Sequence, residues 1–347
     1  TNLAIHNTGT ASEGVITLRL TLFSGDPAAP SSYTLPDQIL FPGGFYQINN
    51  ILQSNGLSLN SGYIRVDRVD GTAPYYTYAL IHDQVNADGV FVPPIAESSL
   101  RGSKALTLPV VVENGTFSSE LVLTNWSTSK KSVHFNFLDQ ENQSHGSSSS
   151  FVIELKAREQ MILPSLGRWL RPHRASELAF AYRSYLGSLI ATVKEGDVDG
   201  IFLGVRISKR GQLGRYSFFY ASVPEGMAST ASSWLYGLRQ NAETRTNLAL
   251  LNTGDADSAP DAFTVDLFDG KSGLKLTTIE GITLNARSWM QFESLLAQYT
   301  IGITQAYARV TKIAGSNPFI AYAVINDGGQ PGERSGDATF VSSSPEH

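Results

Sequence analysis

The chain has 347 residues and a net charge of −5, and its 41% hydrophobic content is enough for several apolar cores. It contains no cysteine, which excludes disulfides and cysteine-ligated zinc. No basic run and no apolar stretch of about 18 residues occurs, so we expect neither a nucleic-acid partner nor a membrane span. A charged fraction of only 16%, with many small polar residues, favours a β-rich protein.

The first predicted strand carries a phrase that returns later in the chain. Residues 1–9 read TNLAIHNTG, residues 246–254 read TNLALLNTG, and a looser copy, ELVLTN, occupies residues 120–125. Self-similarity of this kind is the signature of repeated structural units. We therefore predict three tandem modules, with joins near two proline-containing stretches. The predicted modules are residues 1–97, 98–223 and 224–347.

Apolar residues alternate with polar ones after each copy, at residues 15–23, 132–138 and 262–268. This alternation predicts strands with one buried face. One short stretch per module has apolar residues at helical spacing, and we expect a crossover helix there, at residues 46–52, 165–170 and 290–299. With the dense turn signals between strands, the sequence predicts an all-β protein of three tandem antiparallel β-sandwich modules, each with one short crossover helix.

Modules 2 and 3 begin with an additional strand, at residues 105–111 and 233–239, whereas module 1 begins directly on the repeated phrase. We therefore expect an open sheet edge in module 1 that accepts a strand. Its expected position is the first strand: Thr1, Asn2, Leu3, Ala4, Ile5, His6 and Asn7. A preceding module, another segment of the same chain, or a strand donated by a neighbouring subunit would each fill it.

No motif for nucleophilic, phosphate-binding or zinc chemistry occurs, so we expect no enzyme activity and no cofactor. Two short acidic runs resemble fragments of calcium loops, and their carboxylates are Asp197, Asp199, Asp255 and Asp257. Neither run continues into a complete calcium-binding pattern. The competing interpretation is that these carboxylates are solvated turn residues.

Aromatic residues are concentrated on two predicted strands, one near the end of module 1 and one near the end of module 2. Such side chains stack on sugar rings or protein partners when they face outward, and pack in the core when they face inward. The candidates for a ligand-facing role are Tyr75, Tyr76, Tyr78, Tyr216 and Phe218.

The repeated phrase, the alternating strand after it and the later Gly-Tyr-x-Arg-Val stretch together resemble tandem modules in large secreted or surface proteins of environmental bacteria. Those modules look like immunoglobulin-type β-sandwiches. The resemblance implies an extracellular or cell-surface location and an adhesive or structural role rather than an activity. It covers modules 1 and 3 closely and module 2 loosely.

Two functions follow as hypotheses. The first is a non-catalytic structural or adhesive rod of three modules in a surface stalk or filament, assembled by strand complementation at module 1. Its partners would be other copies of itself or neighbouring modules of a longer chain. The alternative is a carbohydrate- or surface-binding module that uses strand aromatics, with a polysaccharide as the partner.

Overall fold

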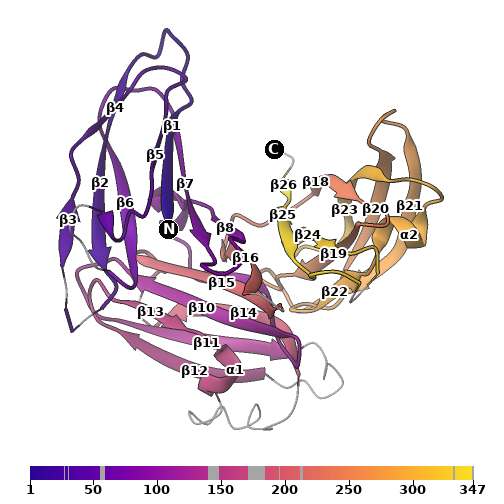
Figure 1. Ribbon diagram of the computed structural model, residues 1–347. Helices are drawn as coiled ribbons and strands as arrows, with labels where there is room; N and C mark the ends of the chain where they lie inside the picture. Colours follow the sequence, from indigo (N-terminus) through magenta and orange to yellow (C-terminus); the bar gives the residue numbers. More distant parts are fainter. Residues whose placement is uncertain are drawn as a thin grey trace.

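The computed structural model describes residues 1–26, 28–29, 31–54, 59–139, 148–170, 184–194, 196–211, 214–330 and 333–345. These residues form antiparallel sheets with two short α-helices, so the protein is all-β as predicted. The strands divide in chain order into three bodies, to which we apply the names module 1, module 2 and module 3 (Figure 1).

Module 1 consists of two four-stranded sheets that face each other around an apolar cluster. One sheet has the order β5-β1-β7-β8, and in the other β2 pairs with β3, β4 and β6. The predicted alternation is confirmed in β2, whose Ile16, Leu18 and Leu20 are fully buried because a period of two places them on one face. Its strands are β1 (Asn2–Asn7), β2 (Ile16–Ser24), β3 (Ser32–Thr34), β4 (Gln38–Leu40), β5 (Phe45–Ile48), β6 (Gly62–Asp70), β7 (Tyr75–His82) and β8 (Gly89–Val92).

Module 2 follows a short 3-10 helix, η2 (Glu97–Leu100), whose Leu100 is buried in the core of this module. Its two sheets have the orders β13-β10-β15-β16 and β12-β11-β14-β9-β17. Its elements are β9 (Ala105–Glu113), β10 (Phe117–Asn125), β11 (Lys131–Asp139), β12 (Ser148–Leu155), β13 (Gln160–Leu163), α1 (Leu166–Leu170), β14 (Tyr185–Val193), β15 (Ile201–Arg210), β16 (Arg215–Ala221) and β17 (Val223–Pro224).

Module 3 repeats the same plan, with sheet orders β22-β19-β24-β25 and β21-β20-β23-β18-β26. Its elements are β18 (Ser232–Arg239), β19 (Thr244–Asn252), β20 (Asp261–Asp269), β21 (Lys275–Leu284), β22 (Trp289–Phe292), α2 (Leu295–Tyr299), β23 (Gln305–Ala314), β24 (Phe319–Asp327), β25 (Ala338–Ser342) and β26 (Ser344–Pro345). The strands that carry the repeated phrase, β1, β10 and β19, occupy the same place in the three modules.

Two of the three predicted helices are shorter than expected or absent. Residues 46–48 lie in β5, which pairs with β1, so the helix predicted for residues 46–52 is wrong. Ile51 is nevertheless fully buried, and its N–H donates to the carbonyl of Thr1 at 2.9 Å. In module 3 the helix begins only at Leu295, because residues 290–292 pair with β19. Helical spacing of apolar residues also arises when a short strand is followed by a tight turn.

The predicted position of the open edge is also wrong. Strand β1 pairs with β5 on one side and with β7 on the other, so residues 1–7 form an interior strand. Among the described residues, β6 pairs only with β2, whereas its counterparts β14 and β23 each have a second partner, β9 and β18. The strand that module 1 lacks would therefore lie beside β6. In modules 2 and 3 the first strand, β9 or β18, pairs with β14 or β23 and not with the strand that follows it in the chain. The strand β6 is the counterpart of β14 and β23.

The boundary predicted at residue 223 lies slightly too early. Pro224 pairs with Leu106, and the N–H of Glu225 donates to the carbonyl of Ala105 at 2.9 Å. Both residues therefore belong to the sheets of module 2.

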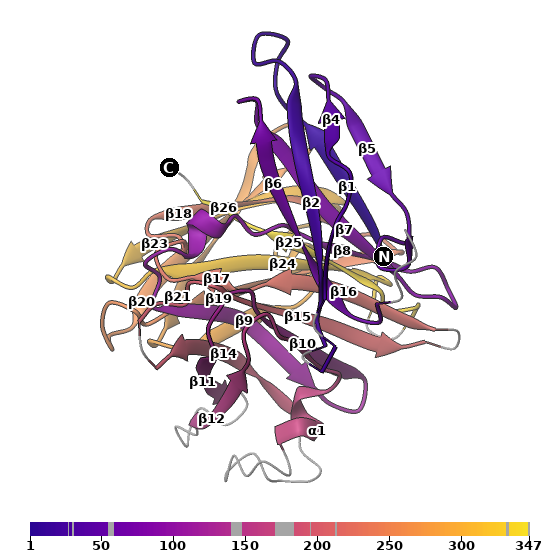
Figure 2. The same cartoon turned by 90° about the vertical axis from the view of Figure 1, so that its left-hand side faces the viewer.

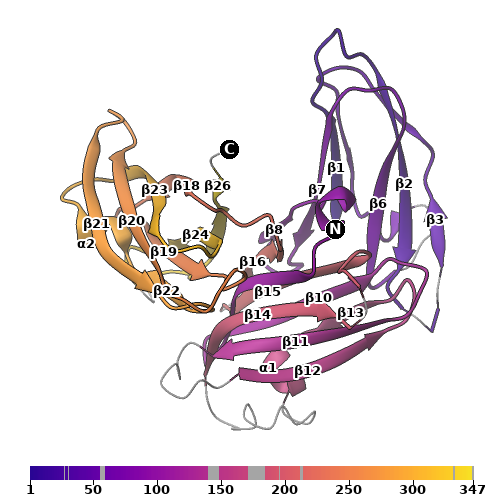
Figure 3. The same ribbon diagram turned by 180° about the vertical axis from the view of Figure 1, so that it is seen from behind.

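The modules do not follow one another along a straight line. Strands β8, β16 and β25 hold the same place in the three modules, and β16 contacts both β8 and β25 near the centre of the molecule (Figure 1). Modules 1 and 3 therefore both rest on module 2, and the same arrangement is seen from two other sides in Figures 2 and 3. The three modules are therefore arranged in a bend around module 2, and not in the straight rod that was expected (Figure 1).

Candidate functional site

The described residues contain no group of three or more His, Cys, Asp or Glu side chains placed to hold a metal ion. No helix in this part of the chain has the length and apolar character needed to cross a membrane. Three of the four acidic candidates, Asp197, Asp255 and Asp257, make local structural contacts through their carboxylates. Asp255 pairs with Arg287 at 3.1 Å, while Asp257 accepts the Ala259 N–H at 2.8 Å. Asp197 accepts the Asp199 N–H at 3.3 Å within the turn before β15.

A cavity of about 350 Å³ lies where the three modules meet. Its walls are mostly rings and aliphatic groups, including Phe91 of module 1, Tyr220 of module 2 and Phe340 of module 3. Among the described residues that line it, Tyr220 alone has an ionisable side chain, and its hydroxyl donates to the Val110 carbonyl. Burial raises the pKa of this phenol, so it stays neutral. The described lining of the cavity therefore offers mainly apolar contact.

Aromatic side chains form a row across the outer face of the β5-β1-β7-β8 sheet, and we call this set the aromatic row. The rings of Tyr76 and Tyr78 lie 6.1 Å apart, and Tyr78 lies 5.2 Å from Phe91. Tyr76 and Phe91 are each 44% exposed. The row is completed by Phe45 and His6, whose rings are 6.4 Å apart. Figure 1 shows this sheet on the side of module 1 that is turned toward module 3.

A second group, which we call the aromatic cluster, lies on the outer face of module 3. Phe268 and Tyr307 are directly opposite each other on β20 and β23, with their rings stacked at 5.0 Å. Trp234 contacts both rings and stacks with Tyr236 at 6.1 Å, and Tyr236 is 56% exposed. The guanidinium of Arg309 lies 5.4 Å from the Trp234 ring, which is cation–π geometry.

Module 1 uses the matching position for contact with module 2. Phe23 and Tyr63 are the counterparts of Phe268 and Tyr307, and they stack at 4.9 Å. Arg158 of module 2 lies over the Phe23 ring at 5.3 Å, and the N–H of Gln160 donates to the carbonyl of Gly25. A stacked pair at this position is therefore a surface onto which another part of the protein docks in module 1.

The five predicted aromatic candidates do not share one face. Tyr76 and Tyr78 belong to the aromatic row, but Tyr75 packs against the module 1 core and Phe218 against the module 2 core. Tyr216 is half-buried on β16, opposite Lys209. The aromatic cluster was not predicted. Its signal was a pair of aromatics at nearly the same spacing in both modules, 40 residues in module 1 and 39 in module 3, but only the strand register places them side by side.

The hairpin turn between β7 and β8 joins module 1 to module 2 through backbone groups. Asp83 accepts the Arg215 N–H at 3.2 Å, and Asp88 accepts the Ser217 N–H at 2.9 Å. The side-chain amide of Asn86 donates to the Arg215 carbonyl at 3.1 Å. Hydrogen bonds to Val85, Asn86 and Arg215 lower the pKa of Asp83, whereas burial raises the pKa of Asp88.

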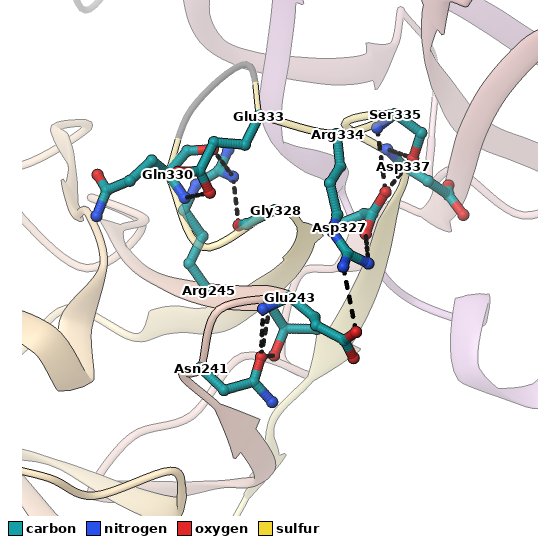
Figure 4. A network of polar contacts seen from close by, with 11 residues as sticks. Asn241, Glu243, Arg245, Asp327, Gly328, Gln330, Glu333, Arg334, Ser335 and Asp337 are labelled. Carbon is teal, nitrogen blue, oxygen red and sulfur yellow. Dashed lines mark hydrogen bonds and ion pairs between the residues drawn. The ribbon is translucent and has the colours of Figure 1, made fainter.

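The equivalent turn of module 3 is held by the polar network in Figure 4. Arg334 contacts Glu243 at 3.1 Å and Asp327 at 3.7 Å, and Arg245 donates to the Gly328 carbonyl at 2.9 Å. Asp337 ends this turn and approaches Asp88 of module 1. Burial, with Asp88 and Asp327 nearby, raises the pKa of Asp337 to about 6.

No protein-family model matches this sequence, and no curated protein matches it.

Proposed function

We propose that this chain is a non-catalytic extracellular structural or adhesive protein, built from three tandem immunoglobulin-like modules and forming part of a surface stalk or filament. Its partners are other copies of itself or neighbouring modules of a longer chain. The proposal includes strand complementation at module 1, at β6 rather than at the first strand.

The fixed geometry between the modules is the observation that supports this proposal best. Backbone hydrogen bonds from β16 to Asp83 and Asp88 hold module 1, and stacking of Tyr220 on Phe340 at 4.7 Å holds module 3. The apolar cluster of module 2 also continues into Ala249 and Tyr322 of module 3. Contacts of this kind keep modules at set angles, which a load-bearing or spacing element needs, whereas flexibly linked domains lack them.

Protease treatment of intact source cells tests the proposed location and role. An antibody against module 3 should lose its signal when the cells are treated without lysis, and should label appendages in immuno-electron microscopy. A cytosolic protein followed in the same samples should stay intact. Protection of this chain until lysis, or hydrolysis of a glycan or peptide panel by the purified protein, would contradict the proposal.

Glycan binding is the second candidate, and the exposed aromatic cluster favours it. Flat aromatic surfaces on a sheet present ring faces to sugars, and the exposed Tyr236 stacks with the half-buried Trp234. If this function is right, purified protein binds one class of polysaccharide in a glycan array. Tyr236→Ala should then weaken binding roughly tenfold, while Tyr33→Ala, an exposed tyrosine outside both aromatic groups, should not. An array without binding, or equal effects of the two variants, would remove this candidate.

A further inference from the structure

The β6 edge has the features of a strand-binding slot. In modules 2 and 3 the corresponding position lies between two backbone partners: β9 pairs with β14 and β17, and β18 pairs with β23 and β26. Val92, Tyr220 and Val341 hold equivalent positions in the last strand of the two-sheet body of each module. Strands β17 and β26 begin three residues after Tyr220 and Val341, so residues 95–96, which begin three residues after Val92, are their counterpart in module 1. We call the space between β6 and residues 95–96 the β6 slot. An ion pair of 3.6 Å between Arg65 and Glu97 links its two sides.

The backbone of β6 presents its polar groups to this slot. The N–H of Leu35 donates to the carbonyl of Leu20, so the backbone groups of Leu20 face β4 and not β6. Val66 lies opposite Leu20, and in an antiparallel pair its own N–H and C=O must then point away from β2. Ile64 and Arg68 share this orientation. Among the described residues, Val66 alone has a substitute partner there, because the Tyr75 hydroxyl donates to its carbonyl at 3.1 Å.

The core of module 1 is incompletely covered at the same place. Ile64 and Val66 are half-buried, whereas their counterparts in module 2, Leu189 and Ala191, are fully buried. The counterparts in module 3, Ala308 and Val310, are also fully buried. In those modules the inward side chains of β9 and β18 supply the cover, and Leu108 and Leu235 have no exposed surface. The slot therefore lacks both backbone partners and apolar contacts that one strand would provide together.

Charged residues on β6 do not argue against pairing. Charges commonly protect an edge strand from aggregation, and Arg65 and Arg68 lie on β6. However, β23 carries Arg309 and Lys312 at the matching positions and still pairs fully with β18. The charges of this strand are thus compatible with a partner.

Modules 2 and 3 also indicate which sequence pattern a strand in the β6 slot would have and how it would connect to β1. Both β9 and β18 carry a two-residue bulge at the same place, opposite Ser188 and Tyr307. Tyr63 of β6 holds this position in module 1. The inward residues follow the pattern Leu106-x-Leu108-x-x-Val111 in β9 and Ser233-x-Leu235-x-x-Leu238 in β18. Each strand then returns through a short turn, so that its last inward residue lies ten positions before the first inward leucine of β10 or β19.

We propose that the β6 slot is a strand-binding site, and that its occupant is a strand with this pattern, linked by a hairpin to the N-terminal end of β1. The hairpin is the connection that the other two modules use. This inference deepens the proposed structural function and rests on its strand complementation, because it selects one donor for the strand, a neighbouring stretch of a longer chain rather than a second copy. Its test measures the protection of backbone amides in β6. That result does not depend on the cellular location of the protein, which the protease treatment of intact cells measures.

A graft of the module 3 hairpin tests the proposal. Residues 232–245 are placed directly ahead of Thr1, where they restore the spacing between the inward leucines and β1. Hydrogen–deuterium exchange should show the amides of Ile64, Val66 and Arg68 exchanging at least roughly tenfold more slowly than in the ungrafted chain. The melting temperature of module 1 should rise as well.

A second graft, with Leu235→Ser and Leu238→Ser in the added copy only, is the matched control and should give neither effect. Exchange in β19 and β20 of module 3 reports whether each protein is folded. Equal exchange at β6 in both folded grafts would overturn the proposal. Protection of β6 that grows with the concentration of the ungrafted chain would overturn the hairpin occupant, because a second copy would then close the edge.

Discussion

Asn252 lies fully buried in module 3 and joins three parts of the chain. Its amide donates to the Leu284 carbonyl at 3.1 Å, and its carbonyl oxygen accepts the Gly254 N–H at 2.9 Å. Asn7 and Asn125 are also fully buried, and they make the corresponding bonds in modules 1 and 2. The repeated Asn is therefore a clamp between the end of one strand and the turn beyond it, which explains its place in the phrase without any role in chemistry.

Replacing Asn252 with alanine should destabilise module 3 by about 3 kcal/mol, because it leaves the buried Leu284 carbonyl and the half-buried Gly254 N–H without partners. Denaturant unfolding followed by fluorescence measures the change. Asn285→Ala removes an exposed asparagine from the neighbouring turn and should cost less than about 0.5 kcal/mol. Equal effects of the two substitutions would show that the clamp contributes little.

The glycine of the phrase occurs in modules 1 and 3 and has a different reason in each. Gly254 has a φ of 60°, a left-handed conformation that side chains disfavour. At Gly9 the conformation is ordinary, but a Cβ would lie 2.5 Å from the Cβ of Ala73. A glycine at the same position of a repeat can thus be needed for a left-handed backbone conformation in one copy and for close contact with a neighbouring side chain in another.

Strands were the most predictable elements of this protein. Period-two patterns such as Ile16 to Leu22 gave the correct strands because one buried face imposes the alternation directly on the sequence. The helix expected at residues 46–52 failed because tertiary pairing of β5 with β1 decides that segment, and no local pattern reports it. The unpaired edge of module 1 was expected at β1, whereas among the described residues it lies at β6, since strand order within a sheet is a property of the whole module.

The candidate site was predicted only in part for the same reason. Tyr75 and Tyr76 are neighbours in the chain, and the alternation of a strand turns one into the core and the other outward. The aromatic cluster depends on register between strands that lie about 40 residues apart, Phe268 against Tyr307. Sequence spacing predicts which face a side chain occupies, but the pairing partner comes from the fold.

The whole molecule is organised by a junction where equivalent turns of modules 1 and 3 approach β16. Asp88 and Asp337 are counterparts in the two turns, and both have a raised pKa because burial disfavours the charged form. Lys209 of module 2 lies beside Gly336, but it does not cancel the effect at Asp337. The junction therefore brings together two carboxyl groups whose charged forms burial disfavours.

The stability of this junction should increase as the pH falls through about 6. Because the pKa of Asp337 in the folded protein lies above its usual value, the folded protein binds the proton more tightly than the unfolded chain does. Asp337→Asn removes the charge and keeps an oxygen that can accept the Ala338 N–H. Allowing for solvent screening at this half-buried site, the variant should be more stable than the native protein by about 1 kcal/mol at pH 8. The difference should shrink as the pH falls below about 6 and should disappear only below 3.8, the usual pKa of an aspartate, in calorimetric unfolding.

Asp257→Asn provides a control of opposite sign. Hydrogen bonds from Ser316 and Ala259 lower the pKa of Asp257, so its charged form stabilises the folded state at all pH values above its usual pKa. The substitution should therefore lower the melting temperature at pH 8, where Asp337→Asn raises it. If both variants shift the melting temperature in the same direction at pH 8, loss of negative charge alone explains the result. Opposite shifts that converge as the pH falls would locate the proton-linked stability at the meeting point of the three modules.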